Sequence, residues 1–286
     1  MKTLRYVLCD VFTDTPLEGN QLAVFTDARG LDEAAMQALA LELGFSESVF
    51  VFPAEARGHA RIRIFTPRYE LPFAGHPTLG TAFVLVSEGR VSSPGTQSTA
   101  AGEVPIEVDL ATNFAWMTQL PVEFGRVFED RDQIARAIGL EPDDLGSDLP
   151  VQTVTTGLLW TIVPVRDAER LSRAQRDGRA LEQAVAASGD EGLYLFAVTD
   201  EGATARMFDA GHGIGEDPAT GSAAGPLGAY LAEYGLAGMP GSIVVRQGEH
   251  VGRPSELHVE VRDEGGRWRV RVGGGVHVVG SGSFRL

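Results

Sequence analysis

The chain has 286 residues, of which 43% are hydrophobic and 22% charged, a composition typical of a globular protein with a sizeable core. Its formal net charge of −15 disfavours nucleic-acid binding, because an acidic surface repels phosphate. No run of 18 apolar residues occurs, and Met1–Val7 lacks the apolar segment of a signal peptide. The single cysteine, Cys9, excludes an internal disulfide and thiolate metal clusters. We therefore expect a cytoplasmic protein without membrane spans.

The first half of the chain alternates short strands with two helices. A helix is expected from Asp32, as its N-cap, to Leu43, with apolar residues at helical spacing. The small, apolar segment Thr78–Val86 is expected to be a buried helix. Residues 92–102 are rich in Ser, Thr and Gly and should form a hairpin or a crossover loop. Strands are expected at Tyr6–Val11, Leu22–Phe25, Ser48–Phe52, Arg61–Phe65, Val104–Val108 and Phe114–Met117.

The second half shows the same kind of order. Helices are expected at Gln133–Gly139, as an amphipathic segment at Leu171–Ala187, and as a small-residue, apolar segment at Ala219–Tyr234. Strands are expected at Val151–Thr155, Trp160–Pro164, Leu193–Val198, Ala205–Phe208 and from Ile243 onward. A strand-rich pattern with one buried helix per half predicts an α+β fold and not alternating βαβ units.

The two halves also match each other in sequence. His76–Ala82 matches Asp217–Ala223, with Pro, Gly and Ala identical in register about half the chain apart. Two further matches lie upstream in the same order, Arg63–Phe65 with Arg206–Phe208 and, more roughly, Glu47–Phe52 with Glu191–Phe196. An internal repeat predicts two pseudo-symmetric halves that bring equivalent helix N-termini to one cleft. Pro77 and Pro218 are expected near the first helical positions, with free N–H groups that attract an anion.

Three acid-base candidates lie within these matching segments, Glu47, His76 and Asp217. Glu47 has apolar neighbours that favour a general acid-base role, although a solvated turn residue is the simpler interpretation. His76 and Asp217 occupy equivalent places in the match and should face each other across the cleft. Taken alone, His76 could be a loop histidine bonded to the backbone, and Asp217 could be a helix N-cap.

Other chemistry-bearing residues carry weaker signals. Ser222 lies at a helix start without the G-x-S-x-G pattern of a nucleophile, so substrate binding or helix capping is expected. His212 is a weak cleft candidate in the loop before Asp217. The histidines form no compact ligand pattern such as H-E-x-x-H, and no metal site is expected.

Segments along nearly the whole chain resemble one family, the PhzF-like isomerases of phenazine biosynthesis. They are Asp10–Thr13 with Gly19–Phe25, Phe45–Val51, Arg63–Pro67 with Glu70–Pro77, Glu216–Gly225, and Gln247–Glu249 with Gly252–Ser255. The resemblance implies a diaminopimelate-epimerase-like fold, in which two barrel-like halves each wrap a central helix and the active site lies between them. It also implies an isomerisation that uses no cofactor and no metal.

In the family's phenazine enzyme the substrate is trans-2,3-dihydro-3-hydroxyanthranilate, and a glutamate moves a proton from one ring carbon to another. The resemblance assigns that role to Glu47. It implies that His76 and Asp217 bind and orient the substrate and assist proton transfer. The remaining implied substrate-binding residues, which would hold a carboxylate and other polar groups, are Gly75, Thr220, Gly221 and Ser222. A small carboxylate substrate and a homodimer are therefore expected.

Racemases of the same fold use two cysteines, one per half, whereas this chain has only Cys9. Racemisation by two thiols is therefore disfavoured, and a single carboxylate shuttle remains available. A non-catalytic protein that binds small molecules on the same fold is the alternative from another class. The first half is expected to comprise residues 1–120, completed by 278–286, and the second half residues 121–277.

Overall fold

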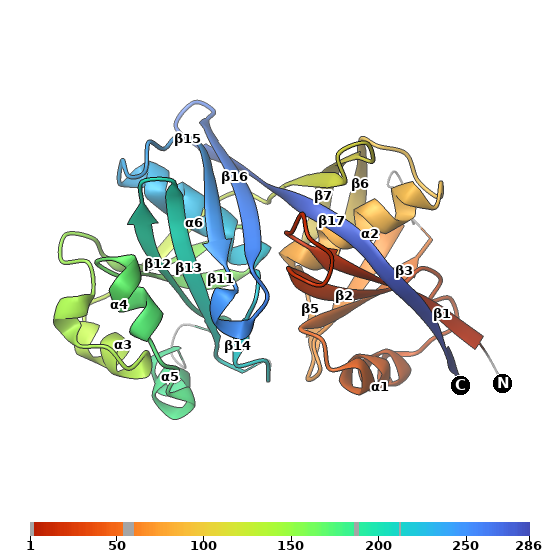
Figure 1. Ribbon diagram of the computed structural model, residues 1–286, viewed down its shortest axis with the longest axis horizontal. Coiled ribbons are helices and arrows are strands. Elements are labelled where there is room, and N and C mark those ends of the chain that lie inside the picture. Colours follow the sequence, from red (N-terminus) through yellow and green to blue (C-terminus); the bar gives the residue numbers. More distant parts are fainter. Residues whose placement is uncertain (1–2, 54–59, 186–188, 212) are drawn as a thin grey trace.

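In the computed structural model, which describes residues 3–53, 60–185, 189–211 and 213–286, the chain forms two lobes side by side (Figure 1). Each lobe curves its strands around one helix, α2 (Gly75–Ser87) in the first and α6 (Gly221–Glu233) in the second. Both helices are buried along nearly their whole length, which agrees with their small, apolar sequences. Among the described helices, none is long and apolar enough to cross a membrane.

Elements of the same kind follow one another in two repeats. The first repeat comprises β1 (Thr3–Val11), β2 (Asn20–Phe25), α1 (Glu33–Leu43), β3 (Glu47–Phe52), β4 (Ala60–Phe65), β5 (Glu70–Leu71), α2, β6 (Gly95–Thr99), β7 (Gly102–Asp109) and β8 (Phe114–Thr118). A linking segment holds β9 (Glu123–Phe128), α3 (Arg131–Ala137) and the short 3-10 helix η1 (Pro142–Asp144). The second repeat comprises β10 (Val151–Thr155), β11 (Leu159–Pro164), α4 (Ala168–Arg173), α5 (Gly178–Val185), β12 (Gly192–Thr199), β13 (Gly202–Asp209), β14 (Glu216–Asp217), α6, β15 (Gly241–Gln247), the 3-10 helix η2 (Glu249–Val251), β16 (Ser255–Asp263) and β17 (Trp268–Arg285).

Strand pairing is the same in the two repeats. In the first, β1 pairs with β2, β3 with β4, β6 with β7 and β7 with β8, all antiparallel, whereas β2–β3 and β4–β6 are parallel. In the second repeat, β10 to β17 pair in the same order and with the same directions. The two-residue strands β5 and β14 extend β4 and β13. The predicted internal repeat and the buried helix of each half are therefore confirmed.

Two equivalent ion pairs fix the true register of the repeat. Arg63 on β4 donates two hydrogen bonds to Glu70 on β5, and Arg206 on β13 donates two to Glu216 on β14. Each bidentate pair ties a short strand to its neighbour just before the central helix begins. The segment from β5 to α2 therefore corresponds to the segment from β14 to α6.

This register corrects the one expected from sequence identity. The equivalent helix starts are Gly75 and Gly221, so His76 corresponds to Ser222 and not to Asp217. The proline pattern that suggested the match lies inside α2 but ahead of α6. The expectation that Pro77 and Pro218 both lie near the start of a helix is therefore wrong for the second repeat. The two segments were aligned on identical residues, whereas their helices begin at different points of that alignment.

Most predicted elements are confirmed within a few residues, including α1 with its Asp32 cap. The single helix expected over Leu171–Ala187 is wrong, because the chain forms α4 and α5, separated by an extended turn; residues 186 and 187 lie outside the described part of the chain. The buried guanidinium of Arg206 donates hydrogen bonds to the carbonyl oxygens of Leu171, Ser172 and Ala174 at the end of α4. Asp177 then accepts N–H groups that open α5. These two side chains favour a break in the helix.

The last strand, β17, crosses from one lobe to the other (Figure 1). Its first part pairs with β16, residues 271–275 pair with β8, and residues 276–285 pair with β1. The predicted division after residue 120 lies between β8 and β9, and it stays a prediction.

Candidate active site

The first turns of the two central helices touch backbone to backbone. A Cβ atom on Gly75 would lie 2.6 Å from the Cα of Gly221 and 2.6 Å from the backbone nitrogen of Ser222. Neither helix receives a capping hydrogen bond from its N-cap side chain, which belongs to Ala74 in α2 and to Thr220 in α6. First-turn N–H groups have no acceptor within their own helix, so donors and the positive ends of two helix dipoles gather at one place. The predicted meeting of helix N-termini is confirmed.

This contact makes Gly75→Ala a test of helix packing. The new methyl group would meet the α6 backbone, which cannot move aside as a flexible side chain could. We expect the free energy of unfolding in urea to fall by about 1–3 kcal/mol, as in other overpacked sites. Gly211→Ala is the matched control, since a Cβ there meets no atom within 4 Å. Equal stability of the two variants would contradict the close contact.

Glu47 and His76 face each other within the first repeat. Glu47 opens β3, which runs parallel to β2, and His76 is the second residue of α2. Glu47 Oε2 lies 3.6 Å from His76 Nε2, and the two side chains are 12% and 3% exposed. The alternatives of a solvated turn for Glu47 and a loop position for His76 are therefore wrong. A carboxylate with a small accessible surface is suited to exchange a proton with a bound molecule.

Burial sets the charge of His76. It lowers the pKa of the imidazole from 6.5 to about 3, while an interaction with the backbone of Gln21 acts more weakly in the other direction. The ring is consequently neutral at neutral pH. A neutral imidazole can donate a hydrogen bond from one ring nitrogen and accept one at the other.

The depressed pKa of His76 predicts a pH dependence of stability. The unfolded chain binds a proton near pH 6.5 and the folded chain only near pH 3, so the neutral ring stabilises the fold fully above pH 6.5. That contribution is lost as pH falls toward 3, at up to about 1.4 kcal/mol per pH unit. We expect the free energy of unfolding of His76→Gln to fall less steeply than that of the wild type between pH 7 and 5, measured by urea unfolding. Parallel curves would contradict the assignment.

Asp217 comes to the same place from the second repeat. Its buried carboxylate accepts hydrogen bonds from Asn20 Nδ2 at 2.9 Å and Ser46 Oγ at 2.8 Å through Oδ1, and from Thr220 Oγ1 at 2.7 Å through Oδ2. These hydrogen bonds fix the orientation of the Asp217 carboxylate. Asp217 is not the N-cap of α6, which is Thr220. Although Asp217 is not the repeat equivalent of His76, Asn20 bridges the two side chains.

A second set of hydrogen bonds holds Thr220 in place. Gln247 donates from Nε2 to the Asp217 carbonyl at 2.8 Å and to Thr220 Oγ1 at 2.9 Å. Its Oε1 accepts from the Thr220 backbone at 3.2 Å and from the Tyr194 hydroxyl at 3.0 Å. All donors and acceptors of the Gln247 amide are thereby used in the support of one segment, which keeps the α6 N-terminus rigid.

The structure thus brings together all seven sequence-predicted site residues. Glu47 lies beside His76, Gly75 beside Gly221 and Ser222, and Asp217 bonds to Thr220, while Asn20 connects His76 with Asp217. His212 lies outside the described residues. Sequence reasoning gave no role to three residues that the structure places in the network, Asn20, Ser46 and Gln247. Each stands in a segment that resembles the family, and that position was the only available signal.

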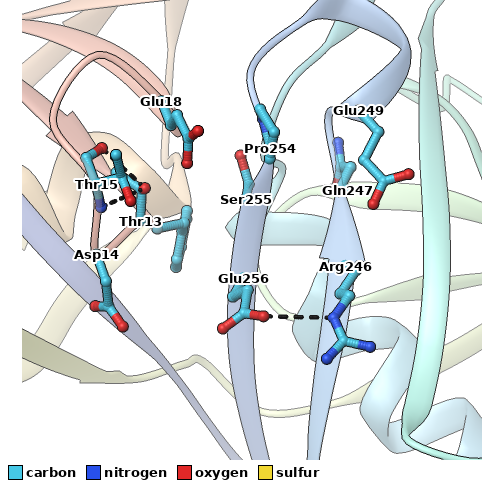
Figure 2. A pocket seen from close by; sticks show the side chains of 11 residues that line it. Thr13, Asp14, Thr15, Glu18, Arg246, Gln247, Glu249, Pro254, Ser255 and Glu256 are labelled. Atoms are coloured by element: carbon cyan, nitrogen blue, oxygen red, sulfur yellow. Dashed lines mark hydrogen bonds and ion pairs between the residues drawn. The ribbon is translucent and has the colours of Figure 1, made fainter.

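A pocket of about 310 Å³ adjoins this network between the two repeats (Figure 2). The site and the pocket share Gln247, and a Cβ on Gly221 would meet the ring of Phe12 at 2.6 Å. The walls carry the carboxylates of Asp14, Glu18, Glu249 and Glu256, and the single basic residue, Arg246, pairs with Glu256. Because the lining is acidic, this pocket is unsuited to a carboxylate, and Glu47, His76 and Asp217 do not line it.

The loop that follows β13 makes another contact between the repeats. The carboxylate of Asp209 accepts N–H groups from Gly211 and Gly213, which shapes the loop. Arg68 Nη1 donates to the Gly211 carbonyl at 3.1 Å. Neighbouring Tyr69 has a raised pKa, caused first by burial and then by carboxylates that include Glu47. The Arg68–Tyr69 turn of the first repeat is therefore in contact with the loop after β13 of the second.

Comparisons with known proteins agree over the whole chain. A family model described as phenazine biosynthesis-like protein matches residues 9–282. A trans-2,3-dihydro-3-hydroxyanthranilate isomerase of Pseudomonas aeruginosa is 37% identical over 281 residues, which cover 98% of this chain and 96% of that protein. The crystal structure of a Bacillus anthracis phenazine biosynthesis protein of the PhzF family has a TM-score of 0.90 at 29% identity, covering 100% of both chains.

A more distant likeness concerns the fold alone. The structure of a hydroxyproline epimerase from Agrobacterium vitis has a TM-score of 0.67 at 12% identity, covering 99% of this chain and 91% of that one. Together with the repeated strand order around two central helices, these likenesses confirm the expected diaminopimelate-epimerase-like α+β fold.

Proposed function

Because the chain belongs to the phenazine biosynthesis-like protein family and is an isomerase of that family, we propose that it moves a proton between two carbons of a small carboxylate without a cofactor. The leading substrate is trans-2,3-dihydro-3-hydroxyanthranilate, the substrate in the name of the Pseudomonas aeruginosa relative. The observation that carries the proposal is the pairing of Glu47 with a buried, neutral His76 beside two helix N-termini.

Glu47 acts as the single acid-base group in this proposal. Its carboxylate takes a proton from one ring carbon, and the C–H electron pair passes into the conjugated system of the substrate. The protonated Glu47 then returns the proton to another ring carbon, so that no atom or electron is gained or lost. Cys9 supports a carboxylate over a thiol base, because it is buried in β1 and burial raises the pKa of its thiol.

The substrate carboxylate is placed at the paired helix N-termini. N–H groups at the starts of α2 and α6, around Gly75, Gly221 and Ser222, are oriented to bind an anion, and this local field offsets the acidic charge of the chain. Asp217 and Thr220 are placed to orient polar groups of the substrate. His76 donates a hydrogen bond that stabilises negative charge as the proton leaves.

The proposal is tested by incubation of the purified protein with trans-2,3-dihydro-3-hydroxyanthranilate in D2O, followed by NMR of the ring signals. The expected result is conversion to the isomer, with solvent deuterium at the carbon that receives the proton. Failure of the folded protein to convert this compound would contradict the substrate. Conversion that persists in a Glu47→Gln variant would instead contradict the assigned base.

A further inference from the structure

We infer that Asn20 is a positioning residue that fixes His76 in the tautomer with the proton on Nε2 and thereby makes His76 a hydrogen-bond donor beside Glu47. This inference rests on the proposed function for its catalytic meaning. For the state of the ring it rests on the contacts of Asn20 and on the burial of His76.

Asn20 lies where the two repeats meet. It opens β2 in the first repeat, and the residue is 1% exposed. Its amide nitrogen, Nδ2, lies 2.9 Å from Asp217 Oδ1, 2.9 Å from the Ala219 carbonyl oxygen and 3.2 Å from His76 Nδ1. One side-chain nitrogen therefore contacts two segments of the second repeat and the candidate histidine of the first.

The orientation of this amide follows from its neighbours. A carbonyl oxygen can only accept, and the carboxylate of Asp217 has donors from Ser46 and Thr220 around it. Rotating the Asn20 amide by half a turn would place its oxygen against two acceptors at 2.9 Å. The NH2 group must therefore face Asp217, Ala219 and His76.

The orientation of the amide determines which ring nitrogen carries the proton. An NH2 group cannot accept a hydrogen bond, so a proton on His76 Nδ1 would oppose a second donor 3.2 Å away. Burial keeps the ring neutral, with one N–H. The contact of Nδ1 with the Asn20 NH2 group assigns this N–H to Nε2. That atom lies 3.6 Å from Glu47 Oε2. His76 therefore presents a donor, and not a base, to the space next to the proton-transferring carboxylate.

The backbone around Asn20 is itself immobilised from the second repeat. Arg253 Nε donates to the Gly19 carbonyl at 2.8 Å, and its Nη2 donates to Asp10 Oδ1 at 2.6 Å. Gly19 N–H donates to the Pro254 carbonyl at 3.0 Å. Gly19 has φ of +70°, and a Cβ there would meet the Val11 carbonyl at 2.5 Å, so glycine is required. These contacts keep the Asn20 side chain pointed at its three acceptors.

The test reads the ring directly. Protein labelled with 15N-histidine gives long-range 1H–15N correlations that distinguish the two tautomers, and His76→Gln assigns the signals among the six histidines. We expect Nε2–H in the free wild-type enzyme, without any substrate. In Asn20→Leu, of similar size but without donors, Nε2–H should no longer be the single form. In Asn20→Asp, where the side chain can accept, Nδ1–H should dominate.

Ser46→Ala is the matched control, because Ser46 donates to the same Asp217 oxygen but is not a partner of His76. It should keep Nε2–H. With a compound that the wild-type enzyme converts, Asn20→Leu should lower kcat by about 10²-fold with a much smaller change in KM, as expected for a misplaced catalytic group.

An Nδ1–H ring in the wild type would overturn the inference even if no variant folds. So would an Asn20→Leu variant that retains both Nε2–H and kcat. Because the tautomer is measured without substrate, a failure to convert trans-2,3-dihydro-3-hydroxyanthranilate contradicts the proposed function and leaves this result standing.

Discussion

Glu47→Gln is expected to lower kcat by at least about 10²-fold, because the amide cannot take up the proton that the carboxylate shuttles. The fold should persist, since glutamine has the same size and Glu47 lies at the partly accessible start of β3. KM should change little, as Glu47 is assigned to proton transfer and not to binding. Steady-state kinetics and the rate of deuterium uptake from D2O measure the same loss independently.

The matched control for this variant is Glu42→Gln, which makes the same chemical change at an exposed position of α1. It should retain wild-type kcat. A Glu47→Gln enzyme that keeps more than a small part of its activity would sink the single-base mechanism. If the wild type and Glu42→Gln bound the substrate but neither exchanged a C–H proton, the result would favour a non-catalytic binding protein.

Asp217→Asn is expected to affect both activity and stability. The carboxylate accepts from Asn20, Ser46 and Thr220, and an amide would place an NH2 group against at least one of these donors. Since hydrogen bonds to charged groups are worth about 1.5–3 kcal/mol, we expect the free energy of unfolding to fall by about 1–3 kcal/mol. We expect kcat/KM to fall by about 10²-fold, because substrate orientation and the His76 contacts both depend on this carboxylate.

Asp200→Asn, in the exposed turn between β12 and β13, is the control for loss of one negative charge. Urea unfolding and kinetics of both variants separate the local network from the overall charge. Wild-type kcat/KM in a folded Asp217→Asn protein would show that the network supports structure alone. A change in Asp200→Asn of similar size would mean that net charge and not the site is responsible.

The sequence predicted most of the fold because its signals are local. The Asp32 cap, the apolar spacing of α1 and the small residues of the two central helices all act within a few residues. The predicted register of the repeat was wrong, because ion pairs such as Arg206–Glu216, which join strands across a loop, mark the true register and are not visible as local identity. The prediction of one helix over α4 and α5 was wrong for a similar reason, since the hydrogen bonds at the break come from Arg206 on a strand distant in sequence.

The sequence predicted that the candidate site lies where the two halves meet, but not the hydrogen bonds that connect its residues. Glu47, His76 and Asp217 were each recognised within a motif, whereas the contacts of Asn20 with His76 and Asp217 were not predicted. Asn20 and Asp217 are almost two hundred residues apart, and no spacing rule relates a side chain at the start of β2 to one on β14. Such a contact depends on how the repeats pack, which single-sequence patterns do not encode.

The crossing of β17 between the lobes has a consequence for biosynthesis. Strand β1 leaves the ribosome long before its partner in β17, residues 276–285. The first lobe therefore keeps this edge of β1 open until residues 276–285 have been made, and exposed edges are prone to pair with other chains. A chain that is truncated before residue 276 lacks the segment of β17 that pairs with β1 in the first lobe. Completion of the first lobe thus depends on the strand that also belongs to the second.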